Sequence, residues 1–350
     1  MPERWDQAGF RVRVDTFLAG FLAEEAGHLV AVDEALRPVA GQLRAAAAHG
    51  KRLRAAFCYW GWRAAGQPDN DALLRAAASM ELVHAAAVVH DDLIDDSPLR
   101  HHAPTAHVAL RAAVAGRPGA RAAARSLAML VGDHLMALAG QLLATSGLPA
   151  AYLARARPVW SELARELIAG ECLEILSTGA PPDTDRSLKV VRYKTAKYTV
   201  EQPLLIGGLL AGAAPGLRAG LRAYGLPLGE AFQLRDDLLG LFGESGTTGK
   251  AGLDDIRGHR PTTLLARAWE AACPAQRAEL AALLGRRDLD ESDLHTVRQL
   301  LRELKAPGQV EELIAARVKE AVGSLGGLGM PAAAHRALTD LARTATDRPY

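Results

Sequence analysis

Two segments of the chain group carboxylates at the end of an apolar stretch. They read His90-Asp91-Asp92-Leu93-Ile94-Asp95-Asp96 and Phe232-Gln233-Leu234-Arg235-Asp236-Asp237. On a helix, Asp91 and Asp95 stack on one face, and such like-charged pairs repel by about 0.2–0.5 kcal/mol. This grouping calls for a compensating cation. Hard oxygen ligands suit Mg²⁺, which commonly binds one or two carboxylates together with substrate phosphates and water.

The second cluster offers Asp236 and Asp237. If its helix opposes the first one, the two clusters face a shared cavity, as metal-binding carboxylates do in helix bundles. One isolated cluster is as readily a solvated helix end, where acids oppose the helix macrodipole at a cost of about 0.3–1 kcal/mol each. Two clusters in apolar helices, both followed by basic residues, favour a metal site.

Several basic residues are candidates for binding phosphate. Lys51 and Arg54 open a predicted helix three residues apart, so they can converge on one anion at its positive N-terminal end. Arg100 follows the first cluster directly and offers a planar fork to phosphate oxygens. Further candidates are Lys194, Lys197, Lys250 and Arg260. Each of these residues alone is more typical of a solvated surface, but together with the carboxylates they indicate a diphosphate site.

His84 precedes Asp91 by two helical turns and lies on the same face. A lone histidine on an apolar helix is commonly a core residue that has its hydrogen-bond partners. Its alignment with Asp91 makes a role in ligand binding an equal alternative.

The elements that must position these residues are helical. We expect helices over residues 12–34, 53–65, from Asn70 or Asp71 to about 96, 105–115, 120–145, 150–177, 185–213 and 217–242, and shorter amphipathic helices to about 344. Glycine and proline breaks separate them, with a loop at 98–104. Residues 243–260 lack apolar periodicity and are expected to form a functional loop. No alternating strand pattern stands out.

Composition agrees with an all-α fold, because alanine and leucine are abundant and aromatics make up only 5% of the 350 residues. The net charge of +1 shows no basic excess for nucleic acid. Three well-separated cysteines favour neither a disulfide framework nor a zinc site, so we expect a cytoplasmic protein. The longest uncharged run, 202–217, contains proline and glycines and is predicted to be a buried helix rather than a membrane anchor.

Together these residues resemble the trans-isoprenyl diphosphate synthase (polyprenyl synthetase) family, and bacterial geranylgeranyl diphosphate synthases in particular, over roughly 50–265. The matching segments are Gly50-Lys51-Arg52-Leu53-Arg54, His84, Asp91 to Asp95 (D-D-x-x-D), Arg100, Pro104-Thr105, Tyr193-Lys194-Thr195, Phe232 to Asp237 (F-Q-x-x-D-D) and Thr248-Gly249-Lys250. The resemblance implies an all-α, single-domain bundle over residues 1–350 with a central active-site cavity.

It also implies the reaction, in which isopentenyl diphosphate condenses head-to-tail with dimethylallyl, geranyl or farnesyl diphosphate to give an all-trans product. The allylic substrate ionises, the isopentenyl double bond attacks the cation, and pyrophosphate removes the proton. Roughly three Mg²⁺ ions are implied as cofactor with diphosphate bound. The implied metal ligands are Asp91, Asp92, Asp95, Asp236 and Asp237.

By the same resemblance the remaining residues bind substrate. Those implied for the allylic diphosphate are Arg100, Lys194 and Lys250, and those for isopentenyl diphosphate are Lys51, Arg54 and His84. Thr195 and Gln233 would stabilise the allylic cation. The family's second arginine and following glycine are replaced by His101 and His102, so isopentenyl diphosphate binding at His101 is expected to be weaker or pH-dependent. Gly240 replaces the third aspartate of the second motif.

In this family the product grows toward the N-terminus of the first-motif helix, and residues one turn before Asp91 form a floor. Ala86 and Ala87 are small there, which predicts geranylgeranyl diphosphate or a longer product. Farnesyl diphosphate as main product, a terpene cyclase on the same fold and a non-catalytic subunit are the alternatives. Lys51, Arg54 and His84 argue against a cyclase, and the intact acids argue against a non-catalytic subunit. The family also implies a homodimer.

Overall fold

The computed structural model describes residues 5–243, 254–286 and 288–347. Most of these residues are helical and only two short strands occur among them, which confirms the predicted all-α fold. The chain divides into two compact units, one made of Met1–Arg155 and Gly207–Gly212 and the other of Ala156–Ile206 and Ala213–Tyr350. The expectation of one domain over 1–350 with a central cavity stays a prediction, and each unit is described by itself.

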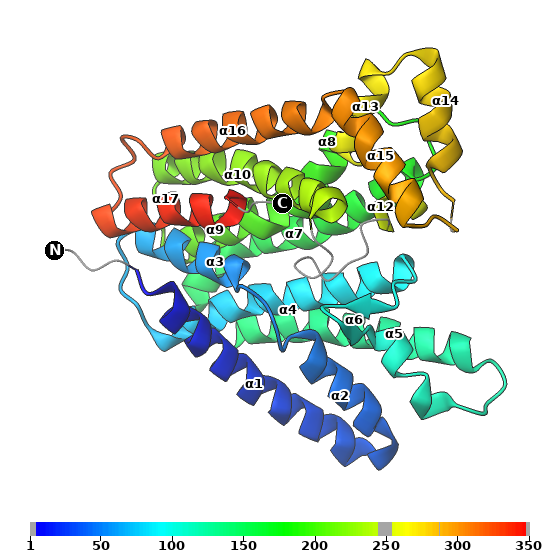
Figure 1. The fold of residues 1–350 in the computed structure, drawn as a ribbon. Coiled ribbons are helices and arrows are strands. Elements are labelled where there is room, and N and C mark those ends of the chain that lie inside the picture. The colour runs from blue at the N-terminus through cyan, green and yellow to red at the C-terminus, as the bar shows by residue number, and fades with distance from the viewer. Residues whose placement is uncertain (1–4, 244–253, 287, 348–350) are drawn as a thin grey trace. The chain divides into compact units, whose positions relative to one another are not determined.

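The first unit carries the first acidic cluster. Its elements are α1 (Gln7–Val32), the 3₁₀ turn η1 (Glu34–Leu36), α2 (Arg37–Ala46), α3 (Leu53–Ala64), α4 (Asp71–Ile94), the strands β1 (Leu99–Arg100) and β2 (Ala103–Pro104), α5 (Ala106–Ala109), the 3₁₀ turn η2 (Ala112–Val114) and α6 (Ala120–Ala144). Helix α4 packs along α6 and against α3, while α1 and α2 form a helical hairpin (Figure 1). Helix α3 is buried along nearly its whole length, so it forms the centre of this unit's core.

Helix α4 begins where its capping residue predicts. The Asn70 side chain accepts a hydrogen bond from the Leu73 N–H at 2.8 Å, as an N-cap residue does. Among the described residues, α4 and α6 are long and apolar enough to cross a membrane by length and composition, and 72% and 44% of these segments are buried in the protein. The apolar character of α4 therefore serves the core.

The second unit carries the second acidic cluster. Its elements are α7 (Ala150–Ser177), α8 (Thr184–Val190), the π-helix η3 (Val191–Glu201), α9 (Gln202–Leu210), α10 (Pro215–Phe242), α12 (Asp254–Arg257), α13 (Thr263–Ala271), α14 (Pro274–Leu283), α15 (Glu291–Glu303), α16 (Ala306–Ser324) and α17 (Ala332–Thr346). The first residues of α7 and the last of α9 belong to the first unit. Helix α10 packs against η3 and α16, which places the helix of the second cluster at the centre of its unit.

The π-helix η3 is held by glycines on its neighbours. A Cβ added to Gly170 of α7 would lie 2.2 Å from the Lys194 backbone nitrogen. On α10, an added Cβ would lie 2.7 Å from the Glu201 Cα at Gly225 and 2.4 Å from the Ala196 carbonyl oxygen at Gly229. Since no side chain fits at these contacts, the glycines let η3 approach both helices. π-Helical turns are rare and are frequent at functional sites.

Several boundary predictions were wrong. Residues 37–46 form α2, for which no helix was expected, and the expected loop at 98–104 contains the hairpin of β1 and β2. The single helix expected over 185–213 is α8, η3 and α9 in succession. The expected loop at 243–260 lies partly outside the described residues, and its described part includes the short helix α12.

Candidate functional site

The first cluster occupies the last turn of α4. Asp91 and Asp95 are half-buried, and Asp92 is only 5% exposed. Asp95 is the C-cap residue, and its N–H donates to the Asp91 carbonyl oxygen at 2.9 Å. Helical packing of α4 against α6 fixes this turn, so the three carboxylates are presented from one rigid element.

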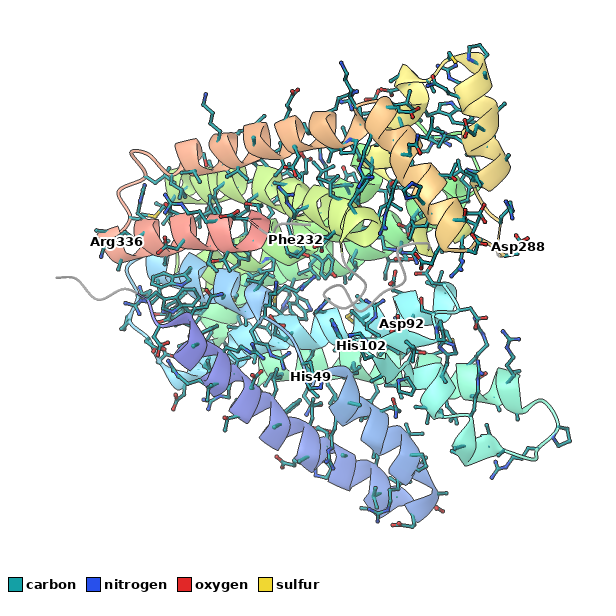
Figure 2. The ribbon with its side chains drawn as sticks, viewed as in Figure 1. His49, Asp92, His102, Phe232, Asp288 and Arg336 are labelled. Atoms are coloured by element: carbon teal, nitrogen blue, oxygen red, sulfur yellow. The ribbon has the colours of Figure 1, made fainter. Side chains whose placement is uncertain are left out.

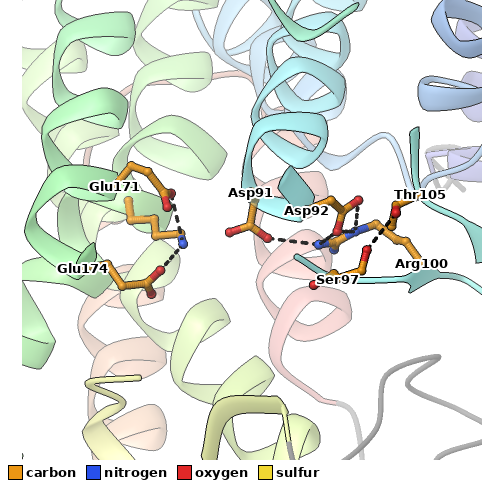
Figure 3. Close-up of polar contacts among 8 residues, drawn as sticks. Asp91, Asp92, Ser97, Arg100, Thr105, Glu171 and Glu174 are labelled. Atoms are coloured by element: carbon orange, nitrogen blue, oxygen red, sulfur yellow. Dashed lines mark hydrogen bonds and ion pairs between the residues drawn. The ribbon is translucent and has the colours of Figure 1, made fainter. Parts of the chain in front are cut away.

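Arg100 forms ion pairs with two acids of this cluster. Its Nη2 lies 3.0 Å from Asp91 Oδ2 and 2.6 Å from Asp92 Oδ1. Its Nε also donates to both Asp92 oxygens, at 2.8 and 3.0 Å (Figure 3). One guanidinium thus offsets part of the repulsion between neighbouring carboxylates. The predicted phosphate ligand therefore lies directly beside the predicted metal ligands.

A tight hairpin presents Arg100. Strands β1 and β2 pair Arg100 with Ala103, and the two linking residues, His101 and His102, both have positive φ, 50° and 63°. A two-residue hairpin loop with positive φ at both positions is a type I′ turn, which favours glycine or asparagine. The family's glycine after the second arginine fits this geometry, so its replacement by His102 costs conformational energy. Both histidines are exposed (Figure 2 labels His102).

Thr105, of the predicted P-T motif, fastens the same segment. Its hydroxyl donates to the Ser97 carbonyl oxygen at 2.7 Å, as Figure 3 shows, and its N–H donates to the Pro98 carbonyl oxygen at 3.1 Å. The motif therefore closes the loop that carries Arg100.

The basic residues at the start of α3 differ in their exposure to solvent. Lys51 is exposed, and Arg54 is 7% exposed in the first turn of α3. Arg52 between them has φ 54° and is 4% exposed, and its side chain donates to the carbonyl oxygens of Ala47 at 2.6 Å and His49 at 3.3 Å. Arg52 therefore shapes the loop from inside.

Two acids complete this arrangement, the half-buried Asp15 and the buried Glu81, and neither was predicted from the sequence. Asp15 Oδ1 lies 2.5 Å from Arg52 Nε, and Glu81 Oε2 lies 3.8 Å from Arg52 Nη1. Glu81 Oε1 also accepts the Ala55 N–H at 2.8 Å, so it satisfies one of the backbone donors at the start of α3. The glutamate in an otherwise apolar stretch of α4 was the available signal, since a buried acid needs partners.

His84 is half-buried on α4, in the field of several charges of the same unit. Burial lowers its pKa well below the usual value, and the positive charges of Arg54, Arg100 and Arg52 lower that pKa further, against the opposing effect of Asp91. The imidazole is therefore neutral at pH 7. This setting shows that His84 shares the electrostatic environment of the predicted phosphate ligands.

We expect the depressed pKa of His84 to make folding stability pH-dependent. The unfolded chain binds the proton first, at a pKa of about 6.5. Stability contributed by neutral His84 is thus complete above that pH and is lost below it, by at most about 1.4 kcal/mol per pH unit. Urea unfolding of wild type and His84→Gln between pH 5 and 8 measures this loss as a difference between the two profiles. The same comparison for exposed His28→Gln is the control, and parallel profiles for wild type and His84→Gln would contradict the expectation.

In the second unit, the cluster on α10 is ordered by its own neighbours. Asp236 is half-buried, Asp237 is buried, and the Gln233 amide nitrogen donates to Asp237 Oδ1 at 2.8 Å. This bond leaves the Gln233 carbonyl oxygen as the end of the amide that can face a cation. Phe232, labelled in Figure 2, precedes it on α10.

Arg235 fastens the same turn to two other helices. Its guanidinium binds both oxygens of Glu311 on α16, at 2.6 and 2.7 Å, and donates to the Thr346 carbonyl oxygen at the end of α17, at 2.9 Å. The bidentate geometry fixes the orientation of the residue that directly precedes Asp236.

Lys194 lies on η3 between two glutamates of α7. Its Nζ is 3.0 Å from Glu171 Oε2 and also forms an ion pair with Glu174 (Figure 3). Thr195 beside it is half-buried. Glu171 and Glu174 were missed from the sequence, although their spacing of three places both acids on one helix face. In this structure the predicted phosphate ligand Lys194 is thus held by two carboxylates.

The structure brings together Asp91, Asp92 and Arg100 in the first unit, and Gln233 and Asp237 in the second. Lys250 lies outside the described residues. The acids present carboxylate oxygens from single helical turns, a donor chemistry that fits Mg²⁺. The site residues therefore fit the implied ion by ligand type and presentation.

Comparisons with known proteins agree with these motifs. The polyprenyl synthetase family matches residues 39–301. The (2E,6E)-farnesyl diphosphate synthase of Mycobacterium tuberculosis is 31% identical over 327 residues, 92% of this chain and 84% of that protein. Octaprenyl diphosphate synthase of Escherichia coli is 30% identical over 264 residues, 75% of this chain and 74% of that protein.

Among solved structures, a geranylgeranyl pyrophosphate synthase from Corynebacterium glutamicum, complexed with isoprenyl diphosphate and magnesium, has a TM-score of 0.93 and 32% identity. The match covers 99% of this chain and 100% of that one. The relatives' names span several product lengths, but they share one family of synthases. This chain belongs to the polyprenyl synthetase family, the trans-prenyl diphosphate synthases.

Proposed function

We propose that the protein is a Mg²⁺-dependent prenyltransferase that condenses isopentenyl diphosphate with an allylic diphosphate to give all-trans geranylgeranyl diphosphate or a longer product. One observation carries the proposal: Arg100 lies against Asp91 and Asp92 in the last turn of α4. An arginine fork beside acids that suit a metal is an arrangement for binding a metal-bridged diphosphate. The similar geranylgeranyl pyrophosphate synthase with magnesium and isoprenyl diphosphate bound supports the same proposal.

The proposed metal ligands are Asp91, Asp95 and Asp236, with Asp92 and Asp237 beside them. Mg²⁺ bound there would neutralise the leaving pyrophosphate and so weaken the allylic C–O bond. Arg100, which now forms ion pairs with the acids, would share its donors with the diphosphate oxygens. Lys194, which forms ion pairs with Glu171 and Glu174, would also bind the same diphosphate. Lys250 would be a third cation at this anion.

The second substrate, isopentenyl diphosphate, is proposed to bind at Lys51, Arg54, His84 and His101. Cleavage of the allylic C–O bond sends its electron pair to pyrophosphate. The isopentenyl double bond then forms the new carbon–carbon bond, and the released pyrophosphate accepts the proton. The Gln233 carbonyl oxygen and the Thr195 side chain would stabilise the allylic cation electrostatically, because both present the negative end of a dipole.

Product length is proposed to depend on Ala87. It lies one turn before Asp91 and is half-buried, whereas Ala86 is 0% exposed and packed in the core. Of the two small residues expected at the floor, Ala87 therefore shares the face of Asp91. The next turn on this face, about 5.4 Å further, reaches His84 and Val83.

We expect Ala87→Phe to shorten the main product by at least one isoprene unit, since an aromatic ring would occupy about one turn of the channel. The graded series Ala87→Val, Ala87→Leu and Ala87→Phe should shorten it progressively, as measured by chromatography of the dephosphorylated products. An unchanged product distribution across the series would show that the floor lies elsewhere.

The function is tested with the purified chain, labelled isopentenyl diphosphate and Mg²⁺. Dimethylallyl, geranyl and farnesyl diphosphates are supplied one at a time as starters. Incorporation of label into C20 or longer alcohols after dephosphorylation is expected, together with its loss in excess EDTA. A main C15 product would correct only the length. Cyclised hydrocarbon without label would instead establish a terpene cyclase, and inactivity of the chain alone would favour a non-catalytic subunit.

A homodimer in the cytoplasm is proposed as the working form. Apolar side chains are exposed on α6 at Met129 and Leu130, and on α7 at Ile168, Ile175 and Leu176. Burial of such side chains stabilises association by about 25 cal/mol per Å². Sedimentation velocity is expected to give twice the chain mass of 37.1 kDa. Ile168→Glu with Ile175→Glu should shift the protein toward the monomer, and a monomeric wild type would contradict the proposal.

A further inference from the structure

The last acid of the first cluster, Asp96, has a setting unlike the others. Its φ is 52°, and the Ser97 N–H donates to the Asp92 carbonyl oxygen at 3.0 Å. A left-handed residue followed by this backward bond is the Schellman ending of a helix, a position that favours glycine. Asp96 therefore ends α4 directly after Asp95.

The Asp96 side chain is anchored to α6. Its Oδ2 accepts from Arg121 at 2.7 Å and its Oδ1 from Arg125 at 2.8 Å, while His107 Nε2 lies 3.5 Å from Oδ1. Both arginines compete with any cation for its oxygens. The anchor explains how a non-glycine residue is held in the left-handed conformation, because the ion pairs offset its cost of about 1 kcal/mol.

Arg125 makes a second contact that Arg121 does not share. Its Nη2 donates to the Leu93 carbonyl oxygen at 2.7 Å. Leu93 is in the last turn of α4, where carbonyl groups lack helical partners and carry the negative end of the macrodipole. The Arg125 guanidinium therefore bonds both to the Leu93 carbonyl oxygen and to Asp96, the residue that ends α4. Leu93 lies between Asp92 and Asp95, which are among the proposed metal ligands.

We infer that Asp96 and Arg125 are positioning residues, which hold the last turn of α4 so that Asp91, Asp92 and Asp95 are presented to the metal while Asp96 is not a ligand. The metal part of this inference rests on the proposed function. The clamp itself consists only of contacts between protein groups and can be measured without Mg²⁺, so the two parts are measured separately.

The decisive comparison is Arg125→Met against Arg121→Met. Both remove one positive charge and one ion pair with Asp96, but only the first removes the bond to Leu93. In the metal-free protein, hydrogen exchange of the amides of 92–97 is expected to be at least fivefold faster in Arg125→Met than in Arg121→Met. Equal rates would overturn the clamp.

In the active enzyme, Arg125→Met should raise the half-saturating Mg²⁺ concentration by about five- to tenfold with kcat at saturating Mg²⁺ changed less than threefold, whereas Arg121→Met should stay within twofold. Direct Mn²⁺ titration followed by electron paramagnetic resonance, with inorganic pyrophosphate present, should show the same ratio. If both variants had the same half-saturating Mg²⁺ concentration while the wild type was active, the inference would be wrong. The proposed function would not be affected by that result.

Two further variants keep the test conclusive. Arg125→Lys retains the charge but offers one ammonium to two acceptors, so an intermediate effect is expected if Arg125→Met folds poorly. Glycine suits the left-handed backbone, so Asp96→Gly removes only the ion pairs of the carboxylate with Arg121 and Arg125. This variant should raise the half-saturating Mg²⁺ concentration severalfold. If Asp96→Gly abolished Mn²⁺ binding altogether, Asp96 would be a ligand and the inference would be wrong. A wild type without transferase activity would count against the proposed function, while the exchange comparison would still decide the clamp.

Discussion

Replacing Asp91 or Asp236 by asparagine is expected to lower kcat/KM by about 10²–10³-fold or more, with the fold retained. Each change removes one negative charge from the proposed metal ligands and leaves the side-chain shape nearly intact. The lost interaction develops fully when the pyrophosphate leaves, and single electrostatic groups of this kind contribute about 10²–10³ in rate. Steady-state incorporation of labelled isopentenyl diphosphate measures the effect.

Asp133→Asn on α6 is the matched control. Asp133 is exposed, with His90 Nε2 3.3 Å from its carboxylate, and it has no role in the proposed site. Its activity should remain within about twofold of wild type, as is usual for surface changes. Thermal unfolding of all three variants shows whether the fold is kept. Full activity of either Asp91→Asn or Asp236→Asn would remove that residue from the metal ligands.

Gly170→Ala is expected to prevent normal folding or to destabilise the protein by about 3 kcal/mol or more. The added Cβ would lie 2.2 Å from the Lys194 nitrogen and 2.4 Å from the Tyr193 carbonyl carbon, and both contacts are with backbone atoms. Overpacking commonly costs about 1–3 kcal/mol when side chains can shift, and here η3 itself must move. Urea unfolding, or soluble yield where folding fails, provides the measurement.

Gly323→Ala on α16 separates this contact from a general effect of alanine. Gly323 is exposed, and an added Cβ there meets nothing within 4 Å. Helix propensity then favours alanine by about 0.5–1 kcal/mol. A Gly170→Ala protein as stable as Gly323→Ala would show that η3 is not held by close backbone contact. A stable Gly170→Ala protein with shifted Lys194 should still lose affinity for the allylic diphosphate.

Much of the helical order could be predicted from the sequence, because its signals are local. Helix α7 has the predicted bounds, since proline and glycine breaks flank an amphipathic stretch. Asn70 caps α4 as its residue type predicts. The juxtaposition of Arg100 with Asp91 and Asp92 also agrees with their closeness in the chain. The catalytic and binding roles of all the predicted site residues stay predictions.

The sequence could not reveal features that depend on contacts between distant residues. Arg52 turns inward because Asp15 and Glu81, on other helices, provide its partners. The π-helix η3 follows from the space left by Gly170, Gly225 and Gly229, and helix periodicity does not report such space. Asp96 is the same residue type as its neighbour Asp95. Its different setting comes from ion pairs with Arg121 and Arg125 of α6, which are distant in the sequence.

The most direct test of the account is a crystal structure grown with Mn²⁺ and pyrophosphate, in which anomalous scattering locates the ions. We predict Mn²⁺ ions bound by oxygens of Asp91 and Asp95, at least one ion bound by Asp236, and a single pyrophosphate bridging them with Arg100 as a ligand to the phosphate. Ions confined to one acidic cluster, or a pyrophosphate held without metal, would contradict the central claim that both helix ends serve one diphosphate.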